Sequence, residues 1–273
     1  MNPTAFFRRA MVTAAPVIFA LALPTCSTVP MTGRQQLSLI PDSQVLGMSY
    51  TEYDQFLKEN KLSADAAATA MVKRVGSRVR GAVEKYFNEN GQKDVLADYR
   101  WEFNLIEDKQ INAWCMPGGK VVFYTGILPL TKTETGLAVV MGHEIAHAIA
   151  EHGNERMSQS LLAQFGGVAL DIALKDDPDQ TRQLWGVAFG LGVQVGVLLP
   201  FSRLQESEAD ELGLTFMAMA GYDPNEAVAF WERMAAKKDG QSPPEFLSTH
   251  PSDGARIREI KKLVPKAMKY YKP

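Results

Sequence analysis

The sequence predicts an α+β fold that is mostly helical, with a small β-sheet flanking one central helix. Residues 64–90 carry apolar side chains at helical spacing, and residues 132–152 lie between the start and stop signals of a helix. Between these two stretches, residues 99–108 alternate apolar and polar side chains, and residues 120–126 read KVVFYTG. Both of these shorter stretches are typical of β-strands.

Composition limits the size of the core and the kinds of partner. Of the 273 residues, 46% are hydrophobic and 22% are charged, which is enough apolar material for a sizeable core in one large domain or two small ones. The net charge is −2 and no block of like charges occurs, so we expect no nucleic-acid partner.

Residues 1–25 are predicted to be a secretory signal peptide, which leaves residues 26–273 as the folded domain. Arg8 and Arg9 form a basic start, and an uncharged apolar run follows over residues 10–23. This run is shorter than the roughly 20 residues that a membrane-spanning helix needs, and its layout is that of a bacterial export signal.

Two cleavage sites fit this signal. Residues 20–22 (ALA) suit an ordinary signal peptidase, whereas residues 23–26 (LPTC) resemble a lipoprotein box, whose cleavage places a lipid on Cys26. Pro24 and Thr25 depart from the small residues that this box prefers, and an uncleaved N-terminal anchor is a third alternative. All three alternatives predict an exported, periplasmic protein, and a lipid on Cys26 adds membrane contact through anchorage to the outer membrane.

The chain has two cysteines, Cys26 and Cys115. If Cys26 carries a lipid, Cys115 has no partner and is expected to behave as a small buried hydrophobic residue. If Cys26 carries none, one disulfide can join the two cysteines in an oxidising compartment. Neither alternative leaves a cysteine-based zinc site.

Local signals set several element boundaries. Asp42 or Ser43 is predicted to cap a helix that runs through Lys58, and Gly91 is predicted to end the next helix. Residues 117–119, Pro-Gly-Gly, are predicted to form the turn before the second strand.

The helix over residues 132–152 has clear signals at both ends. Thr131 and Glu134 form a capping box at its start, and Gly153 is expected to stop it. The flanking segments LAVVMG and AIA are apolar, so this helix is predicted to be buried.

His143 and His147 lie four residues apart and therefore project from one face of this helix, with Glu144 beside them. This is the HExxH pattern, in which two histidines bind zinc and the glutamate acts as general base. The alternative is a pair of surface histidines, but buried polar groups need a partner, and a metal ion supplies one. His152, nine residues after His143, is rotated to the far side of the helix and is expected to face the terminal carbonyls instead.

A catalytic zinc site needs a third protein ligand and an open position for water. The downstream segment ESEADE offers Glu206 and Asp210, which are four residues apart on one helical face. One carboxylate can then reach the metal while the other orients a histidine ligand. Glu208 and Glu211 are expected to form a solvated acidic face of the same helix.

The HEIAH and ESEAD segments together resemble the paired HExxH and ExxAD motifs of metallopeptidase family 48. That family includes the CAAX prenyl proteases, the membrane protease HtpX and exported bacterial relatives such as LoiP and BepA. Other segments resemble the exported branch and cover most of the mature chain: MTGRQQLSLI, NAWCMPGGKVVFYTGIL, GVLLPFSRLQESEAD and LSTHPSDGARI.

The resemblance implies a gluzincin-type zinc metallopeptidase with one zinc ion per chain and with Glu206, rather than Glu208, as third ligand. It also implies that the predicted sheet flanks the active-site cleft, where an edge strand binds the substrate backbone by strand addition. The residues expected on this basis to contact substrate are Gly118, Gly119, Val121 and Arg256.

The expected activity is that of a metalloendopeptidase acting on unfolded or misassembled envelope proteins. A zinc ion lowers the pKa of a bound water toward about 7, Glu144 accepts its proton, and the activated water attacks the peptide carbonyl. Two alternatives come from other classes: a chaperone or assembly factor that uses the same cleft without cleavage, and a zinc-stabilised structural module.

His250, in LSTHPSDGARI, has two interpretations. It is either a loop histidine ahead of a helix that starts near Ser252, or an active-site residue. In the second case it stabilises the oxyanion or occupies the open zinc position in a resting state.

Residues 184–201 form an uncharged run whose length is borderline for a membrane helix. The glycines of this run and Gln194 favour a core helix buried in protein instead. Residues 154–183, which precede this run, are expected to form a mobile flap over the cleft.

Overall fold

The computed structural model describes residues 26–175, 179–194, 198–237, 245–250 and 254–272. The predicted signal peptide, with its alternative cleavage sites before Cys26, lies outside these ranges.

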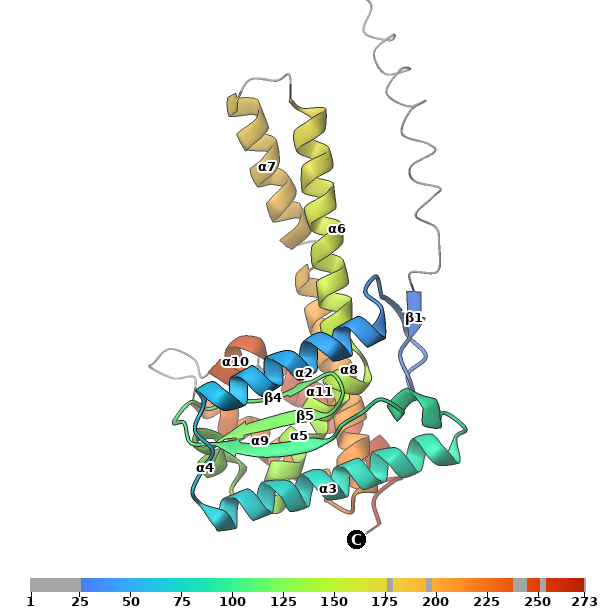
Figure 1. The fold of residues 1–273 in the computed structure, drawn as a ribbon. Helices are drawn as coiled ribbons and strands as arrows, with labels where there is room; N and C mark the ends of the chain where they lie inside the picture. Colours follow the sequence, from blue (N-terminus) through green and yellow to red (C-terminus); the bar gives the residue numbers. More distant parts are fainter. Residues whose placement is uncertain (1–25, 176–178, 195–197, 238–244, 251–253, 273) are drawn as a thin grey trace, which may run out of the picture.

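α-Helices make up most of the described chain (Figure 1), which confirms the prediction of a mostly helical α+β fold. Short 3-10 turns precede the sheet at Lys93–Leu96 and follow it at Thr125–Ile127. The helices are α2 (Asp42–Glu59), α3 (Ala66–Glu89), α4 (Leu128–Thr131), α5 (Glu134–Ile149), α6 (His152–Ala173), α7 (Asp179–Val193), α8 (Leu199–Met219), α9 (Glu226–Ala236), α10 (Glu245–Thr249) and α11 (Gly254–Ala267).

Two small sheets complete the fold. In the larger sheet, β5 (Lys120–Tyr124) is the central strand, with β3 (Glu102–Ile106) parallel on one side and β4 (Ala113–Met116) antiparallel on the other. Near the N-terminus, β1 (Cys26–Thr28) and β2 (Gln35–Leu37) form a separate antiparallel pair. The two predicted strands are confirmed, and β4 is an additional strand.

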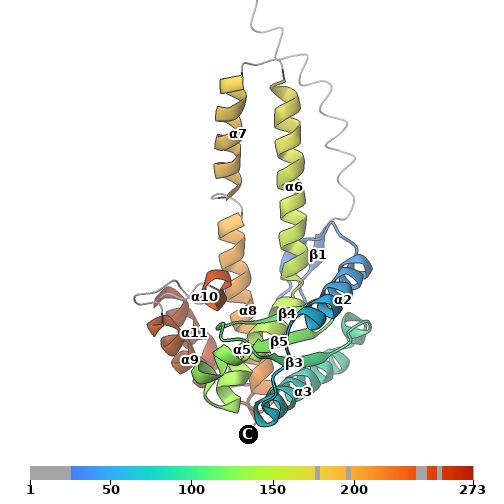
Figure 2. The same cartoon turned by 60° about the vertical axis from the view of Figure 1, so that its left-hand side comes forward.

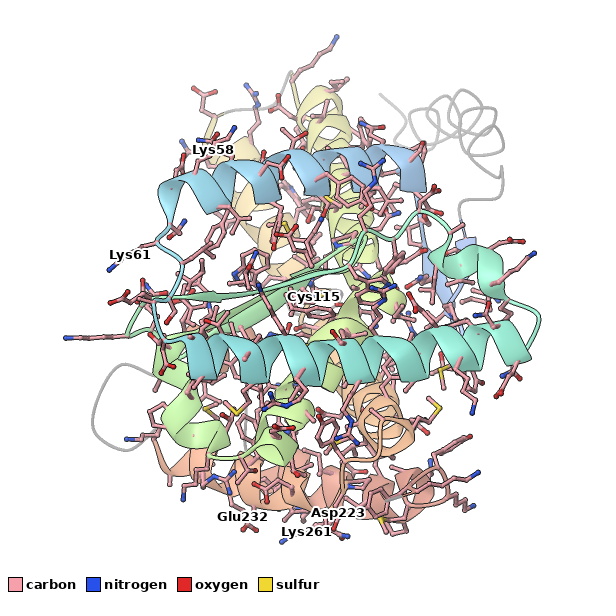
Figure 3. The ribbon with its side chains drawn as sticks, turned by 60° about the horizontal axis from the view of Figure 1, so that its bottom comes forward. Lys58, Lys61, Cys115, Asp223, Glu232 and Lys261 are labelled. Atoms are coloured by element: carbon pink, nitrogen blue, oxygen red, sulfur yellow. The ribbon has the colours of Figure 1, made fainter. Side chains whose placement is uncertain are left out.

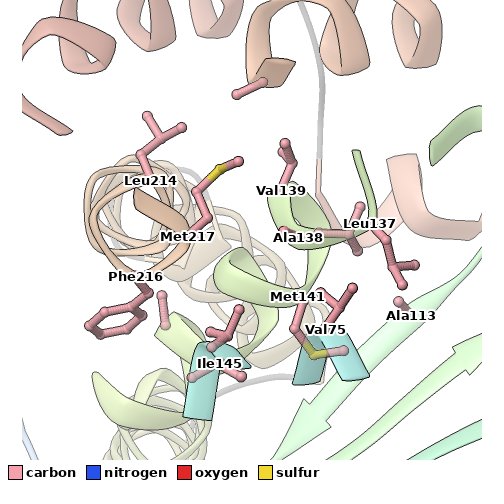
Figure 4. Packing of buried hydrophobic residues seen from close by; sticks show 14 of the residues in the cluster. Val75, Ala113, Leu137, Ala138, Val139, Met141, Ile145, Leu214, Phe216 and Met217 are labelled. Atoms are coloured by element: carbon pink, nitrogen blue, oxygen red, sulfur yellow. The ribbon is translucent and has the colours of Figure 1, made fainter. Parts of the chain in front are cut away.

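The hydrophobic core is centred on α5. Every residue from Gly136 to Ile149 is buried, as expected for a helix with apolar residues on all sides. Figure 4 shows Met141 of α5 beside Val75 of α3, with Leu214 and Met217 of α8 around the same helix. The helix that carries the HExxH motif is therefore held on several sides by the core.

α5 and α8 cross where both helices have a glycine. A Cβ on Gly142 would lie 2.5 Å from the carbonyl oxygen of Gly213, and a Cβ on Gly213 would lie 2.7 Å from the backbone nitrogen of His143. Because neither helix has a side chain at the crossing, the two backbones approach closely and bring α8 directly beside His143.

Two predicted helix caps are wrong. Thr133, rather than Thr131, caps α5, and its hydroxyl accepts a hydrogen bond from the Gly136 amide at 3.1 Å. Thr131 closes α4 instead, an extra turn that the sequence signals did not reveal. α2 begins at Asp42 after Pro41 and has no side-chain cap.

The end of α3 follows its local signal. Its C-cap is Asn90, and Gly91 follows with a φ of +70°, a left-handed conformation that glycine adopts readily. The prediction that Gly91 ends this helix is therefore confirmed.

α6 and α7 form a helical hairpin that projects from the body of the molecule (Figures 1 and 2). Residues 154–173, which were expected to belong to a mobile flap, are regular helix, and the mobility of this region stays a prediction. The buried-core prediction is wrong for α7, because Leu184 is 70% exposed and Trp185 is 55% exposed. The parts of these two predictions at residues 176–178 and 195–197 lie outside the described chain.

None of the helices in the described ranges combines the length and the apolar character that crossing a membrane requires.

Cys26 and Cys115 are both free, so the disulfide that the sequence left open as one alternative is not formed. Cys115 lies inside the body in Figure 3, whereas Lys58, Lys61 and Lys261 lie at its outside. Its side chain packs against the main core, and burial raises the pKa of its thiol well above the usual value. Cys115 therefore behaves as the small hydrophobic residue that the sequence predicted.

Candidate metal centre

Four buried side chains converge between α5, α8 and the end of α10. His143 and His147 come from α5, Glu206 comes from α8, and His250 follows α10. One potential ligand atom from each of the four lies within 4.8 Å of all the others. The structure therefore brings the three predicted zinc ligands together and adds His250 to them.

The spacing of the ligand atoms fits a tetrahedral ion. His143 Nε2 lies 3.1 Å from His147 Nε2 and 3.4 Å from Glu206 Oε2. His147 Nε2 lies 3.2 Å from Glu206 Oε1. Two ligands bound at about 2.0–2.1 Å to a tetrahedral ion are about 3.3 Å apart, so these distances fit zinc ligation. Imidazoles with a carboxylate are also a donor set that zinc accepts.

His250 takes the fourth place in this set. Its Nδ1 lies 3.1 Å from His143 Nε2 and 3.0 Å from Glu206 Oε1, and its side chain is buried. The structure places His250 within the cluster, rather than on an exposed loop. The helix that was expected near Ser252 begins at Gly254, and Ser252 itself lies outside the described chain.

Asp210 holds the other nitrogen of His143. Asp210 Oδ1 lies 3.0 Å from His143 Nδ1, which favours a proton on Nδ1 and leaves Nε2 unprotonated toward the cluster. Arg256 donates to both oxygens of Asp210 at 2.8 Å and pairs with Glu206 at 3.0 Å. Its guanidinium also lies 3.6 Å from the ring centre of Trp231. Arg256 therefore fixes both carboxylates, and its predicted contact with substrate stays a prediction.

A longer chain of hydrogen bonds holds His147. His152 Nδ1 lies 2.8 Å from His147 Nδ1, and His152 Nε2 lies 3.0 Å from Glu208 Oε2. The carboxylate of Glu208 favours a proton on His152 Nε2, so His152 Nδ1 accepts a hydrogen bond from His147 Nδ1. As with His143, this leaves His147 Nε2 unprotonated toward the cluster.

Glu208 is tied in turn to the N-terminal segment. Thr32 donates a hydrogen bond to Glu208, and Arg34 Nε donates to it at 2.8 Å. Arg34 also pairs with both oxygens of Glu155 in α6 at 2.8 Å. The predicted solvated face is thus wrong for Glu208, which is only 7% exposed.

The sequence did not predict that Thr32 and Arg34 belong to this site, because their partner Glu208 is distant in the sequence. Thr32 and Arg34 lie in the segment MTGRQQLSLI, more than 170 positions before Glu208. That segment contributed to the family resemblance, and an arginine that folding partly buries needs a carboxylate partner. Neither the family resemblance nor this requirement identifies Glu208 as the partner.

His152 differs from its prediction because α5 ends earlier than expected. Glu151 adopts a left-handed conformation with a φ of 55°, which breaks the helix after Ile149. α6 then starts at His152, and Gly153 lies inside it. The change of direction brings His152 back against His147, so it does not face the terminal carbonyls.

Glu144 lies beside the cluster and is 3% exposed. Its Oε1 has no hydrogen-bond partner among the described residues, and the nearest His250 nitrogen is 3.5 Å away. Burial raises the pKa of Glu144, and the nearby His250 and His143 partly oppose this effect. A buried carboxylate oxygen without a partner costs free energy, so this oxygen is suited to meet a water or a substrate group.

The charges of the cluster follow from its contacts. Burial lowers the pKa of His143, but hydrogen bonds with Asp210 and Glu206 outweigh burial and raise the pKa to about 9, so a metal ion that binds Nε2 has to displace a proton there. Burial lowers the pKa of His147 well below its usual value, because one of its nitrogens faces His152 rather than a carboxylate. Burial also acts to raise the pKa of Glu206, but its three histidine partners hold that pKa far below the usual range.

The three residues near the sheet that were predicted to contact substrate do not lie on an edge strand. Val121 lies in the central strand β5, paired with Phe103 on one side and Cys115 on the other, so its expected place on an edge strand is wrong. Gly118 and Gly119 form the turn between β4 and β5 with φ values of +84° and +82°. The edge strand that contacts α5 is β4.

Residues 77–264 match the model of peptidase family M48, which is more than half of the chain. The chain therefore belongs to peptidase family M48.

The chain is also similar to curated members of two groups. It is 40% identical to the mitochondrial metalloendopeptidase OMA1 of Schizosaccharomyces pombe over 177 residues, which cover 63% of this chain and 49% of that protein. It is 30% identical to the mitochondrial metalloendopeptidase OMA1 of Homo sapiens over 247 residues, 88% of this chain and 46% of that protein. It is 27% identical to the beta-barrel assembly-enhancing protease of Yersinia pestis over 243 residues, 88% of this chain and 48% of that protein. The chain spans about half the length of these relatives.

Proposed function

We propose that residues 26–273 form a gluzincin-type zinc metalloendopeptidase domain in which His143, His147 and Glu206 hold one zinc ion. The observation that carries this proposal is the convergence of these ligand atoms at the spacing of a tetrahedral site, beside a buried carboxylate. Membership of peptidase family M48 supports it, as do the names of the relatives, which are metalloendopeptidases and a protease.

The residues around the ion have separate roles in the proposed hydrolysis. A bound zinc ion supplies a Lewis acid that acidifies water and polarises a carbonyl. Glu144 accepts the proton of the attacking water through Oε1, which has no other described hydrogen-bond partner, and returns it to the leaving amine. Asp210 and His152 keep protons on the Nδ1 atoms of the two histidine ligands.

His250 gives the site a closed resting state in this proposal. Three histidines and Glu206 fill the four positions of a tetrahedral ion, so water and substrate need the position that His250 holds. Of the two active-site roles considered for His250, this geometry favours the resting ligand over oxyanion stabilisation.

The proposed substrates are unfolded or misassembled envelope proteins. One relative is named a beta-barrel assembly-enhancing protease, which supports a substrate of this class. An extended substrate backbone fits the edge of β4, which lies beside α5. We further propose that residues 1–25 direct export to the periplasm, with outer-membrane anchorage where Cys26 carries a lipid.

The test compares zinc content and casein cleavage in the parent chain, Glu144→Gln and His147→Ala. We expect one zinc ion in the parent and in Glu144→Gln, cleavage only in the parent, and neither property in His147→Ala. Cleavage by Glu144→Gln would contradict the general-base role. A zinc-loaded parent that binds casein without cleaving it would favour the assembly-factor alternative.

A further inference from the structure

Residues 32–40, which include β2, lie against the start of α6. The amide of Leu39 donates to Ser158 Oγ at 2.9 Å, and the side chain of Asn154 donates to the carbonyl of Ile40 at 2.9 Å. Asn154 and Ser158 are both buried, and they lie one helical turn apart on the same face of α6. The N-terminal segment is therefore fixed to the first part of this helix at two points.

Arg34 joins this segment to two helices at once. Its Nη1 and Nη2 donate to the two oxygens of Glu155 in α6, and its Nε donates to Glu208 in α8, each at 2.8 Å. The side chains of Glu155 and Glu208 are 1% and 6% exposed. Within the described ranges, no other arginine or lysine pairs with either carboxylate. One guanidinium therefore serves two buried carboxylates, through a planar fork of donors that a lysine does not have.

The contact between α6 and α8 continues next to a proposed zinc ligand. Gln205 Nε2 donates to Glu155 Oε2 at 2.7 Å, and Gln205 is fully buried. Gln205 immediately precedes Glu206 in α8. The carboxylate that Arg34 holds on α6 is thus bonded to the neighbour of a residue in the metal cluster.

The position of His152 depends on both helices that Arg34 joins. His152 is the first residue of α6, and its Nε2 lies 3.0 Å from Glu208 Oε2 in α8. Its Nδ1 lies 2.8 Å from the Nδ1 of His147. A shift of α6 relative to α8 changes both distances, because His152 moves with one helix and Glu208 with the other. Arg34 is bonded to both helices and opposes such a shift.

We propose that Arg34 positions the metal ligand His147, and that residues 32–40 form an N-terminal clamp of the metal centre. The inference rests on the proposed zinc site and extends it to a further part of the chain. The N-terminal clamp lies outside residues 77–264, which match the family model. The metal centre then depends on a segment that the family match does not contain.

Loss of Arg34 should reach His147 through the two carboxylates. Without the guanidinium, Glu155 and Glu208 are buried without their cation, which costs free energy unless they reach water. α6 then moves so that Glu155 can do so, and it carries His152 away. His147 loses the acceptor for its Nδ1 proton, and we expect zinc affinity to fall by about 10–100-fold.

Zinc affinity of the full chain, measured by competition with a chelator, tests this expectation in Arg34→Gln. The matched control is Arg233→Gln, because Arg233 is 21% exposed, against 16% for Arg34, and pairs with Glu226 within α9. The control should bind zinc like the parent. Equal affinity in Arg34→Gln and the parent would overturn the inference, whereas a parent that binds no zinc would overturn the proposed metal centre itself.

A double-mutant cycle separates positioning from a general loss of stability. When it is added to His152→Ala, Arg34→Gln should lower zinc affinity no further, because the connection to His147 is already broken. A merely structural role would lower the affinity by the same factor with and without His152, and that result would overturn the inference.

Ring nitrogen NMR of the metal-free protein near pH 7 gives a readout that needs no ion. We expect a proton on His147 Nδ1 in the parent and a mixture of both tautomers in Arg34→Gln. Thr32→Val removes one hydrogen bond to Glu208 and leaves the ion pairs in place, so it serves if Arg34→Gln does not fold. It should shift the His147 signals in the same direction. An unchanged tautomer in both variants would overturn the inference.

Discussion

The two histidine ligands are oriented by different partners, although both present Nε2 to the cluster. His143 donates directly to the carboxylate of Asp210, whereas His147 reaches the carboxylate of Glu208 only through His152. Each chain ends in an arginine, the buried Arg256 or the partly buried Arg34, which holds the carboxylate ionised. Metal affinity should therefore depend on residues that never touch the ion.

Glu208→Gln tests the longer of these chains. The amide no longer fixes the proton on His152 Nε2, so His147 loses its preferred tautomer, and we expect zinc affinity to fall by about 10–100-fold. Competition with a zinc chelator measures this change. Glu211→Gln, which alters a carboxylate on the same helix that pairs with Lys266 at the surface, should leave affinity as in the parent. Equal affinities in both variants would show that His152 does not orient His147.

His250→Ala separates the two proposed roles of that histidine. If His250 is the resting ligand, the variant binds zinc more weakly but cleaves casein several-fold faster, because the fourth position stands open to water. Zinc affinity by chelator competition and kcat by peptide release measure the two effects. A large loss of kcat with unchanged zinc affinity would assign His250 to oxyanion stabilisation instead.

At the scale of elements, the crossing of α5 and α8 sets the distance between the ligands that the two helices carry. Gly213→Ala places a methyl group 2.7 Å from the His143 backbone, so the helices must separate. We expect a loss of about 1–3 kcal/mol of stability, and weaker zinc binding, because Glu206 moves away from the histidines.

Urea unfolding with and without zinc measures both effects of Gly213→Ala. Gly47→Ala is the control, because its Cβ meets open space on α2 and alanine is the better helix former. That substitution should stabilise the protein by about 0.5–1 kcal/mol. A Gly213→Ala protein as stable as the parent would show that the crossing tolerates a wider separation.

The junction between α5 and α6 carries a carboxyl group with a perturbed charge. Burial, with the nearby charge of Asp42, raises the pKa of Glu151 from 4.5 to about 7. The folded state then binds a proton more tightly than the unfolded state. The free energy of unfolding of the protein therefore falls as pH rises from about 4.5 to 7.

Glu151→Gln removes that pH dependence. We expect the variant to match the parent near pH 5 and to exceed its free energy of unfolding by about 1–2 kcal/mol at pH 8, after allowance for partial exposure. Urea denaturation at both pH values measures the difference, with the exposed Glu52→Gln as control. A difference that is the same at pH 5 and pH 8 would contradict the account.

Sequence patterns predicted the elements whose signals are local. The stripe on α3 with its glycine stop, the Pro-Gly-Gly turn and the apolar flanks of the HExxH helix each lie within one short window. The break at Glu151, the burial of Glu208 and the pairing of Arg34 depend on residues brought together only by folding. The exposure of α7 was missed because an uncharged run has the same pattern whether the folded protein buries the helix or leaves it exposed.

At the scale of the whole molecule, one network joins the N-terminal segment to the metal centre. Arg34, which follows β1 by a few residues, contacts both α6 and α8 through Glu155 and Glu208. The hairpin of α6 and α7 rises from the same place (Figure 2). The α6–α7 hairpin and the metal ligand His147 are therefore connected through Arg34, Glu208 and His152.

Metal removal tests how far the centre holds the fold together. The proposed ligands come from α5, α8 and the residue after α10, so zinc bound at 1,000 times its Kd should stabilise the folded state by about 4 kcal/mol. Differential scanning calorimetry with excess zinc and with chelator measures the shift in Tm. His147→Ala should unfold at one temperature in both conditions, and a parent with no shift would show that the helices need no ion.

The central claim is that zinc is held by His143, His147 and Glu206, and X-ray absorption at the zinc edge tests it most directly. We expect one zinc ion per chain, surrounded at about 2.0–2.1 Å by imidazole nitrogens and carboxylate oxygen. The imidazole scattering should weaken by one ligand in His250→Ala. A sulfur ligand at about 2.3 Å, or a shell without imidazole, would contradict the account.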